Sequence, residues 1–195
     1  MPISGGFSMQ DHLYELPKNC DFSKTHNASN QEFECSPKLK DKFFSEFHGL
    51  LINAPEEVLW PKNHSLSENI VSPSGNTKGS LRFMVTGLAR LKYKELGLKG
   101  KASYDVVIVA VNQTTAKSYS GRMPRPDYLV IPPPVSNKPE ISLTEADQNA
   151  LLTSHYNFDL IHDIGVPIGE ATYTIYATLG ELKSNTLTVA TRFEK

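Results

Sequence analysis

The C-terminal stretch Ala171-Thr-Tyr-Thr-Ile-Tyr-Ala-Thr-Leu-Gly-Glu-Leu-Lys-Ser-Asn-Thr-Leu-Thr-Val-Ala-Thr-Arg-Phe193 decides the fold class. Apolar residues alternate with mainly Thr, Lys or Arg in two runs, 173–179 and 187–193. Side chains on a strand point to opposite faces with period two, so each run predicts a strand with one buried face. Residues 180–185 supply the turn of this hairpin. The residues expected in the core are Tyr173, Ile175, Ala177, Leu187 and Val189.

Further strands are predicted upstream of this hairpin. Leu50–Leu59 predicts a first strand, which Pro55 interrupts. Leu81–Tyr93 alternates apolar with basic residues and predicts a half-buried strand. Tyr104–Val111 is almost wholly apolar and rich in valine, as is typical of a central strand. A turn after it leads into Ala116–Ser120, which predicts a second hairpin.

Two segments carry helix signals. Ser36 suits an N-cap and Pro37 a first helical position, and the following apolar residues share one helical face, which predicts a short helix over 37–49. The alternative is that a strand begins near Leu50. A second segment from Thr144 predicts one or two helical turns. We therefore divide the chain into an irregular N-terminal extension, residues 1–49, and a β-sandwich domain, residues 50–195.

Short, frequent strands with little helix predict an all-β, antiparallel sandwich. Residues 170–180, followed by 183–189, resemble the last two strands of immunoglobulin-like and fibronectin-III-like domains. In those domains a Tyr-x-Ile/Val-x-Ala strand leads to a Ser-Asn-x-Leu/Val-x-Val strand. Tyr173 is similar to their tyrosine-corner residue. The Cys…Trp…Cys pattern of antibody domains is absent. The resemblance implies an Ig-like β-sandwich and carries no activity with it.

Composition excludes several classes of protein. The chain has 195 residues, of which 39% are hydrophobic and 21% charged, enough for a real core. Its formal net charge of −1 gives no long-range attraction to DNA or to an anionic membrane. No apolar run approaches the ~18–20 residues that span a bilayer. We expect no nucleic-acid partner and no membrane insertion, and the oligomeric state stays open.

The two cysteines, Cys20 and Cys35, stand in a polar segment without metal or redox spacing. We expect them to form a disulfide that staples a loop, although two reduced thiols are the alternative. A disulfide implies an oxidising compartment, so we expect a secreted, periplasmic or cell-surface protein. Three glycosylation sequons, at Asn27, Asn63 and Asn112, fit that location.

The motifs of common catalytic and cofactor sites are absent, including the phosphate loop, the nucleophile elbow and the dinucleotide fingerprint. We therefore expect no cofactor, and we favour a protein that is not an enzyme. The weak metal-ligand candidates are His155, Asp159, His162 and Asp163. His155 and His162 have opposite parity on a strand, which favours ordinary solvated residues.

Two stretches are candidates for binding. The basic residues Arg90, Lys92, Lys94, Lys99 and Lys101 suggest an anion site, but alternation already predicts them as the outward face of a strand. Residues 122–139 hold six of the thirteen prolines and predict an extended segment. Arg122, Arg125 and Tyr128 in its first half are the expected partner contacts, because Arg and Tyr are frequent at binding hot spots.

The sequence favours a non-catalytic module for protein or glycan recognition, adhesion or assembly. Glycan binding requires exposed aromatic rings, for which the candidates are Trp60, Tyr119, Tyr128 and Tyr176. Tyr176 has outward parity on its strand, and Lys183 is expected to be exposed beside it. The alternative is a hydrolase whose active site is assembled from loops.

Overall fold

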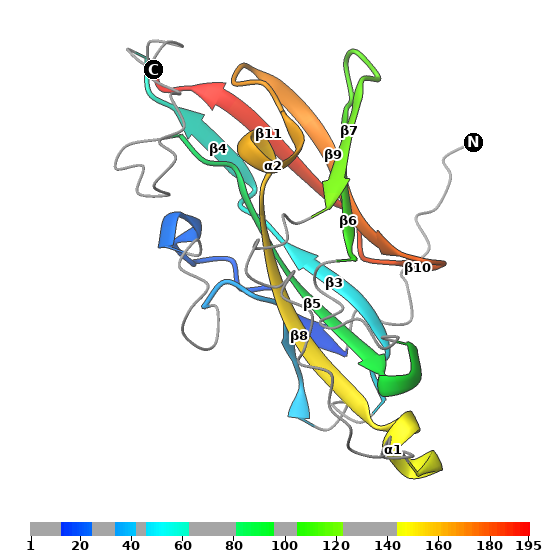
Figure 1. The fold of residues 1–195 in the computed structure, drawn as a ribbon. Helices are drawn as coiled ribbons and strands as arrows, with labels where there is room; N and C mark the ends of the chain where they lie inside the picture. The colour runs from blue at the N-terminus through cyan, green and yellow to red at the C-terminus, as the bar shows by residue number, and fades with distance from the viewer. Residues whose placement is uncertain (1–12, 25–33, 42–45, 63–80, 96–104, 123–143) are drawn as a thin grey trace, which may run out of the picture.

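The computed structural model describes residues 13–24, 34–41, 46–62, 81–95, 105–122 and 144–195. These residues form a mostly β structure of three sheets with two short α-helices (Figure 1). The predicted all-β class is confirmed. Neither helix in this part of the chain is long and apolar enough to cross a membrane.

The first sheet has the order β3-β5-β8 and is antiparallel throughout. Gly87 of the central strand lies under the ring of Tyr156, whose hydroxyl donates a hydrogen bond to the Leu51 carbonyl at 3.1 Å. Because Gly87 has no side chain, the ring can cross the central strand. The strands are β3 (Gly49–Asn53), β5 (Met84–Lys92) and β8 (Leu151–Asp159).

The second sheet has the order β4-β11-β9-β6-β7, and β10 pairs with β9. It contains both predicted hairpins, β6–β7 and β9–β11, which are confirmed. The strands are β4 (Glu57–Trp60), β6 (Val107–Asn112), β7 (Ser118–Arg122), β9 (Ala171–Leu179), β10 (Leu182–Lys183) and β11 (Leu187–Phe193).

The strand predicted over 50–59 is divided between the two sheets. β3 belongs to the first sheet and β4 to the second, with Pro55 in the connection between them. Proline offers no N–H to a ladder, so the chain leaves the first sheet there. β4 then runs parallel to β11, whereas the sequence predicted an antiparallel arrangement.

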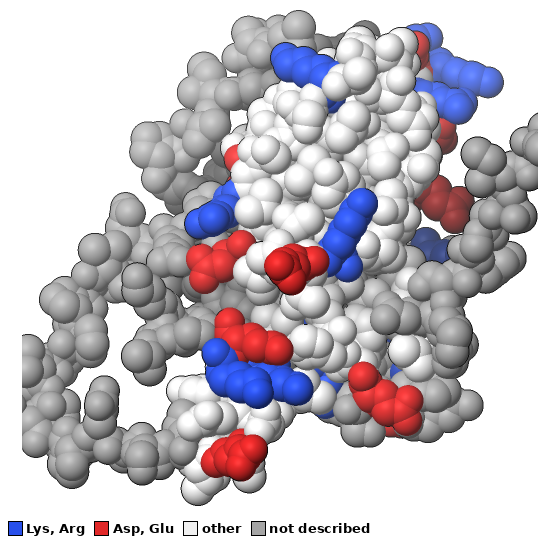
Figure 2. Space-filling view, turned by 90° about the vertical axis from the view of Figure 1, so that its right-hand side faces the viewer, with Lys and Arg blue, Asp and Glu red and all other residues white. Residues whose placement is uncertain are grey.

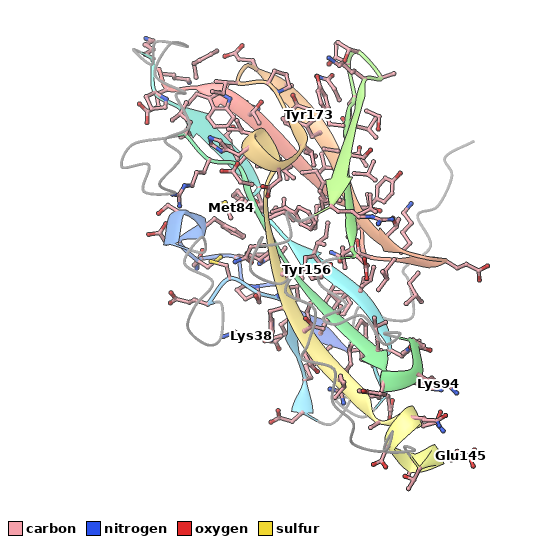
Figure 3. All side chains as sticks on the ribbon, in the orientation of Figure 1. Lys38, Met84, Lys94, Glu145, Tyr156 and Tyr173 are labelled. Atoms are coloured by element: carbon pink, nitrogen blue, oxygen red, sulfur yellow. The ribbon has the colours of Figure 1, made fainter. Side chains whose placement is uncertain are left out.

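The inner faces of the two sheets share one hydrophobic core. The predicted core residues Tyr173, Ile175, Ala177 and Val189 are confirmed, since each is at most 1% exposed. Leu187 is only half-buried, because it lies at the start of its strand. Figure 3 shows Tyr173 beside β9 and Tyr156 at mid-height on the ribbon, level with the first sheet.

The outer face of the first sheet is covered by residues of the N-terminal segment. Leu51 and Leu88 on that face pack with Phe47, Leu13 and Leu39. Leu13 directly precedes β1 (Tyr14–Glu15), and Leu39 ends β2 (Lys38–Leu39). These two strands form a small antiparallel sheet. The described residues of the N-terminal extension therefore pack against the first sheet.

This cover corrects two predictions for β5. The strand was expected to be half-buried, with its basic residues exposed, but it is buried on both faces along nearly its whole length. Arg90 is only 6% exposed, and its Nη1 donates to Thr153 Oγ1 at 2.8 Å. Burial lowers the pKa of Arg90. Lys94 is exposed on the 3-10 turn η4 (Tyr93–Glu95), and Lys99 and Lys101 lie outside the described residues.

The predicted helix over 37–49 is wrong at both ends. Lys38–Leu39 is a strand and Gly49 begins β3, while residues 42–45 lie outside the described residues. The backbone groups of residues 38–39 pair with β1, so they are not available for the hydrogen bonds of a helix. The predicted helical turn after Thr144 is confirmed as α1 (Glu145–Asn149), with a capping box between Thr144 and Asp147. Figure 3 shows Glu145 and Lys94 at the same end of the molecule.

The predicted disulfide is not formed, because Cys20 and Cys35 are both free thiols. Cys35 is fully buried, and burial raises the pKa of its thiol to about 12. Its carbonyl accepts hydrogen bonds from Asn53 Nδ2 at 2.8 Å and Thr86 Oγ1 at 2.9 Å. These bonds tie the N-terminal segment to the first sheet, which is the anchoring that a staple was expected to supply.

Candidate functional site

The second sheet presents one face to the core and the opposite face outward, and we call the latter the outer face. Strand register assigns its residues, because those paired with one another share a side of the sheet. Val109 of β6 is opposite Tyr176 of β9 and Ser120 of β7. The outward positions of the two central strands are Val107, Val109, Val111, Thr172, Thr174, Tyr176 and Thr178.

The outward positions of β6 and β9 are valine, threonine and tyrosine, so these two strands contribute no charged residue to the centre of the outer face. All of these residues are half-buried, as expected for side chains packed side by side on a flat sheet. Figure 2 views the side of the molecule that carries β7, β9 and β10. Its upper part is a broad white surface with charged side chains mainly at the border.

Charged residues occur at the margins of the outer face. Arg122 ends β7, and Glu57 of β4 forms an ion pair with Arg192 of β11 at 3.1 Å. The Glu57–Arg192 pair is well exposed, so it contributes little to stability. An uncharged centre with a polar, charged rim is the usual anatomy of a protein–protein interface.

Tyr176 is the aromatic residue at the centre of this face. The Nζ atom of Lys183 lies 4.2 Å from the centroid of its ring, which is cation–π distance. Lys183 is exposed, as predicted, and Tyr176 is half-buried rather than fully exposed. Beside them Gln113 Nε2 donates to Thr174 Oγ1 at 3.0 Å. Both contacts join side chains on the outer face to one another.

Two of the predicted aromatic candidates do not reach the outer face. Trp60 is 1% exposed, and its Nε1 donates to the Gly169 carbonyl at 2.9 Å, so the prediction of an exposed ring is wrong. Tyr119 alternates to the inner side of β7, where its ring meets that of Tyr173 edge to face. The burial of Trp60 could not be predicted from the sequence because β4 is short. The side of the sheet to which its residues point is set by parallel pairing with β11.

The predicted partner contacts of the proline-rich segment are only partly described. Arg122 is exposed at the end of β7, on the outer face. Arg125 and Tyr128 lie outside the described residues. Of the three, Arg122 alone can be placed against the candidate surface.

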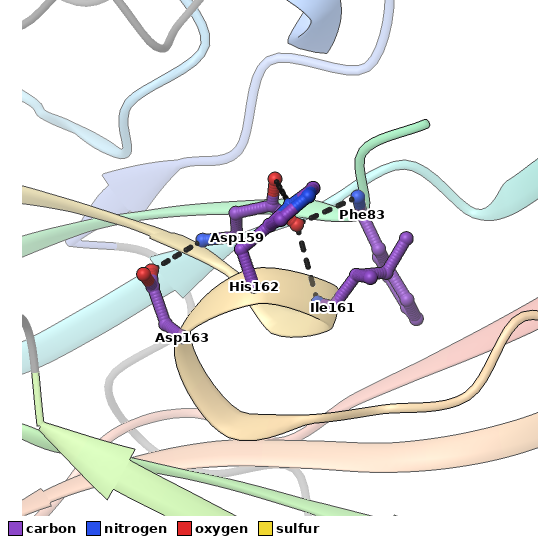
Figure 4. Close-up of polar contacts among 5 residues, drawn as sticks. All are labelled: Phe83, Asp159, Ile161, His162 and Asp163. Atoms are coloured by element: carbon purple, nitrogen blue, oxygen red, sulfur yellow. Dashed lines mark hydrogen bonds and ion pairs between the residues drawn. The ribbon is translucent and has the colours of Figure 1, made fainter. Parts of the chain in front are cut away.

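Asp159 and His162 form a second polar cluster at the start of α2 (Leu160–Ile164) (Figure 4). Asp159 is 1% exposed, and its Oδ2 lies 2.7 Å from His162 Nδ1. Its Oδ1 accepts from the backbone N–H groups of Phe83 and Ile161, at 3.2 and 3.1 Å. Asp163 Oδ2 accepts from the Asp159 backbone N–H at 2.8 Å. The cluster caps α2 and joins it to the start of β5.

The chemistry of this cluster is limited by its partners. A buried carboxylate that holds an imidazole by Nδ1 supplies two of the three members of a catalytic triad. Within the described residues, however, His162 has no hydrogen-bond partner besides Asp159. This part of the chain also contains no group of three or more His, Cys, Asp or Glu residues able to hold a metal. His155 on β8 is not part of the cluster.

A shallow pocket of about 110 Å³ lies where the N-terminal segment meets β11. Pro17, Ala54 and Leu187 are among its lining residues. Pockets for small ligands usually measure about 300–1,000 Å³, so this one is too small for such a ligand.

The outer face is therefore the candidate site. Comparison with known proteins gives no further guide, because no protein-family model, curated protein or solved structure matches this chain.

Proposed function

We propose that this protein is a non-catalytic β-sandwich module that recognises a protein partner through its outer face. The observation that carries the proposal is the run of uncharged outward residues on β6 and β9, among which Val109 and Tyr176 lie side by side. Cores of protein interfaces are depleted of charged residues and enriched in tyrosine. Uncharged, partly apolar patches with a polar rim mark such contacts on otherwise soluble surfaces.

A protein partner fits the face better than a glycan. A glycan-binding surface needs several exposed rings on which sugars can stack. Trp60 is buried, Tyr119 packs on the inner side, and the ring of Tyr176 already carries the Lys183 ammonium group. A single occupied ring makes a poor platform for sugars, whereas valine and threonine methyl groups suit another protein surface.

Two further features belong to the proposal. The resemblance of β9 and β11 to the last strands of Ig-like domains, together with a core shared by two sheets, supports an Ig-like architecture. The parallel pairing of β4 with β11 is its least typical feature. A location outside the cytosol rests on the sequons alone, since the cysteines are free.

Site-specific photocrosslinking tests the proposal. Benzoyl-phenylalanine is introduced at Tyr176 on the outer face or at Leu152 on β8, which is 42% exposed on the first sheet. The protein is expressed in its native host and irradiated. We expect a discrete protein adduct from position 176 and none from position 152.

A charge placed in the centre supplies the specificity control. Val109→Lys should abolish the adduct, because an unpaired ammonium in an interface core is costly to desolvate. Leu152→Lys introduces the same charge elsewhere and should leave the adduct unchanged. Equal crosslinking from positions 176 and 152, or an adduct that survives Val109→Lys, would contradict the proposal. Selective binding of the protein to immobilised polysaccharides would favour the glycan alternative.

A further inference from the structure

Hydrogen bonding fixes the direction of every backbone group on β7. The Asn112 N–H donates to the Lys117 carbonyl at 2.9 Å, which makes these two residues a hydrogen-bonded pair. In an antiparallel ladder such pairs alternate, so Tyr119 and Gly121 also bond to β6. The backbone groups of Ser118, Ser120 and Arg122 must therefore point away from β6, towards the free edge of the sheet.

This edge has no partner among the described residues. The second sheet ends at β7, and no hydrogen bond from another described residue reaches the backbone of Ser118, Ser120 or Arg122. Their side chains are exposed, and the two serines are too small to shield the backbone. An edge strand of this kind is a template on which an extended peptide can add as a further strand.

The strand is also held rigidly, which lowers the entropy lost on binding. Asn112 Oδ1 accepts from the N–H groups of Thr114 and Thr115, at 2.9 and 3.0 Å, and fixes the turn before β7. On the inner side the ring of Tyr119 packs edge to face on Tyr173. Gly121 lies directly against Ile164 of α2. Three anchors therefore hold β7, while no described residue hydrogen-bonds to its outer edge.

Charge indicates the kind of peptide. Lys117 directly precedes β7 and Arg122 ends it; both are exposed, and neither forms an ion pair with a described residue. The Nζ atom of Lys117 lies 4.9 Å from the centroid of the Tyr119 ring, which leaves its positive charge uncompensated. Acidic residues near the ends of an added strand would complement them, whereas a basic peptide would be repelled.

The chain's own residues 123–143 are the competing occupant. Proline lacks the N–H that a ladder needs, and Pro124, Pro126 and Pro132–Pro134 fall within this stretch. That composition disfavours a continuous ladder between this stretch and β7.

We propose that β7 is a docking strand, to which an extended, acidic-ended segment of the protein partner adds by backbone hydrogen bonds. The inference rests on the proposed function and names the form of the partner segment. Because side chains alternate, the segment would place every second side chain beside the outer face, next to Ser118 and Ser120.

Amide hydrogen exchange on the full chain, read by NMR, tests the free edge first. In the free protein the amides of Ser118, Ser120 and Arg122 should exchange fast, and those of Tyr119 and Gly121 slowly. The probe is the capped peptide Glu-Val-Thr-Val-Thr-Val-Glu, with Lys-Val-Thr-Val-Thr-Val-Lys as the charge control. The acidic peptide should slow the three edge amides, and the basic one should bind at least about tenfold more weakly.

Two substitutions at one position separate backbone from side chain. Ser120→Pro removes the edge N–H and should weaken acidic-peptide binding at least about tenfold, while Ser120→Ala should leave it within about twofold. If Ser120→Pro fails to fold, Ser118→Pro at the start of the strand takes its place. Thr188→Lys on β11, beyond β9, should not affect peptide binding.

The proposal is overturned if the edge amides are already protected in the free protein, which would show that the chain covers its own edge. It is also overturned if saturating acidic peptide changes no exchange rate, or if Ser120→Ala weakens binding as much as Ser120→Pro. Peptide binding at β7 without any adduct from position 176 would contradict the proposed function of the outer face but would still support β7 as a docking strand.

Discussion

A methyl group at Gly87 has no room beneath the ring of Tyr156. An added Cβ would lie 2.1 Å from two ring carbons of Tyr156, so the ring would have to move and lose its hydrogen bond to Leu51. Gly87→Ala should lower the free energy of unfolding by about 3 kcal/mol. Gly169→Ala is the matched control, since a Cβ there meets nothing within 4 Å. Urea unfolding would compare them, and equal midpoints would show that the ring crosses the strand elsewhere.

The ionisation of Glu95 makes the free energy of unfolding depend on pH. Burial opposes ionisation of its carboxyl group, but hydrogen bonds from His48 and the Lys92 backbone outweigh burial and hold the pKa of Glu95 below 4.5, its ordinary value. A lowered folded pKa adds stability above the unfolded value, and this stability is lost as pH falls below about 4.5. Glu95→Gln should flatten that acidic limb of the stability curve. An unchanged slope between pH 5 and pH 3 would rule the contribution out.

Arg90 shows why the burial of a single residue was misassigned from the sequence. Alternation predicts that a strand has two unlike faces, and it assigned Arg90 to solvent. Burial of the second face depends on what covers it, and the cover here comes from residues about forty to eighty positions away, including Leu13 and Phe47. Nothing local in the sequence encodes such a contact.

At the scale of elements, the terminal hairpin was predictable because the period-two alternation of its residues marks the buried face directly. Ile175 and Tyr176 are neighbours on β9 with opposite faces. Ile175→Ala should cost about 2–5 kcal/mol of unfolding free energy, the usual cost of a large-to-small core substitution. Tyr176→Ala should cost less than about 1 kcal/mol. Chemical denaturation of the two variants measures both costs, and a larger loss from Tyr176→Ala would mean that the faces are reversed.

The helix α2 was missed because the apolar run Tyr156–Leu160 continues the alternation of β8 into its first turn. Its local signals were present in Asp159, an N-cap whose side chain accepts from Ile161 N–H, and in Gly165, a left-handed C-cap at φ 72°. A short helix of this kind is specified by its caps rather than by periodicity.

The cap at α2 gives a test that separates structure from catalysis. Asp159→Ala should cost about 2–4 kcal/mol of unfolding free energy, because it removes the cap and strands the buried Phe83 N–H. His162→Ala should cost less than about 1 kcal/mol, since the imidazole is partly exposed. Thermal unfolding of the two variants measures this. A hydrolase would instead require both residues for turnover of a substrate, with little change in stability for either.

At the scale of the whole molecule, the outer faces of the two sheets differ in what packs on them. The outer face of the first sheet is covered by the N-terminal segment, and Asn53 Nδ2 bonds to the Pro17 carbonyl at 2.9 Å to hold that cover in place. On the outer face of the second sheet, Val109 and Tyr176 remain half-buried and uncharged. Within the described residues, the N-terminal segment thus packs on the outer face of the first sheet, while we propose that the outer face of the second sheet contacts a partner. The strand pattern predicted the two hairpins of the second sheet, whereas their joining into one sheet and the covering of the other sheet depended on long-range packing.

The central claim is that the outer face of the second sheet contacts a protein partner, and hydroxyl-radical footprinting measures this most directly. Tyr176 lies on that face, while Tyr93 is 40% exposed at the end of the first sheet and serves as an internal reference. With the crosslinked partner present in excess, oxidation of Tyr176 should fall severalfold and that of Tyr93 should stay constant. Unchanged oxidation of Tyr176 in a saturated complex would contradict the account.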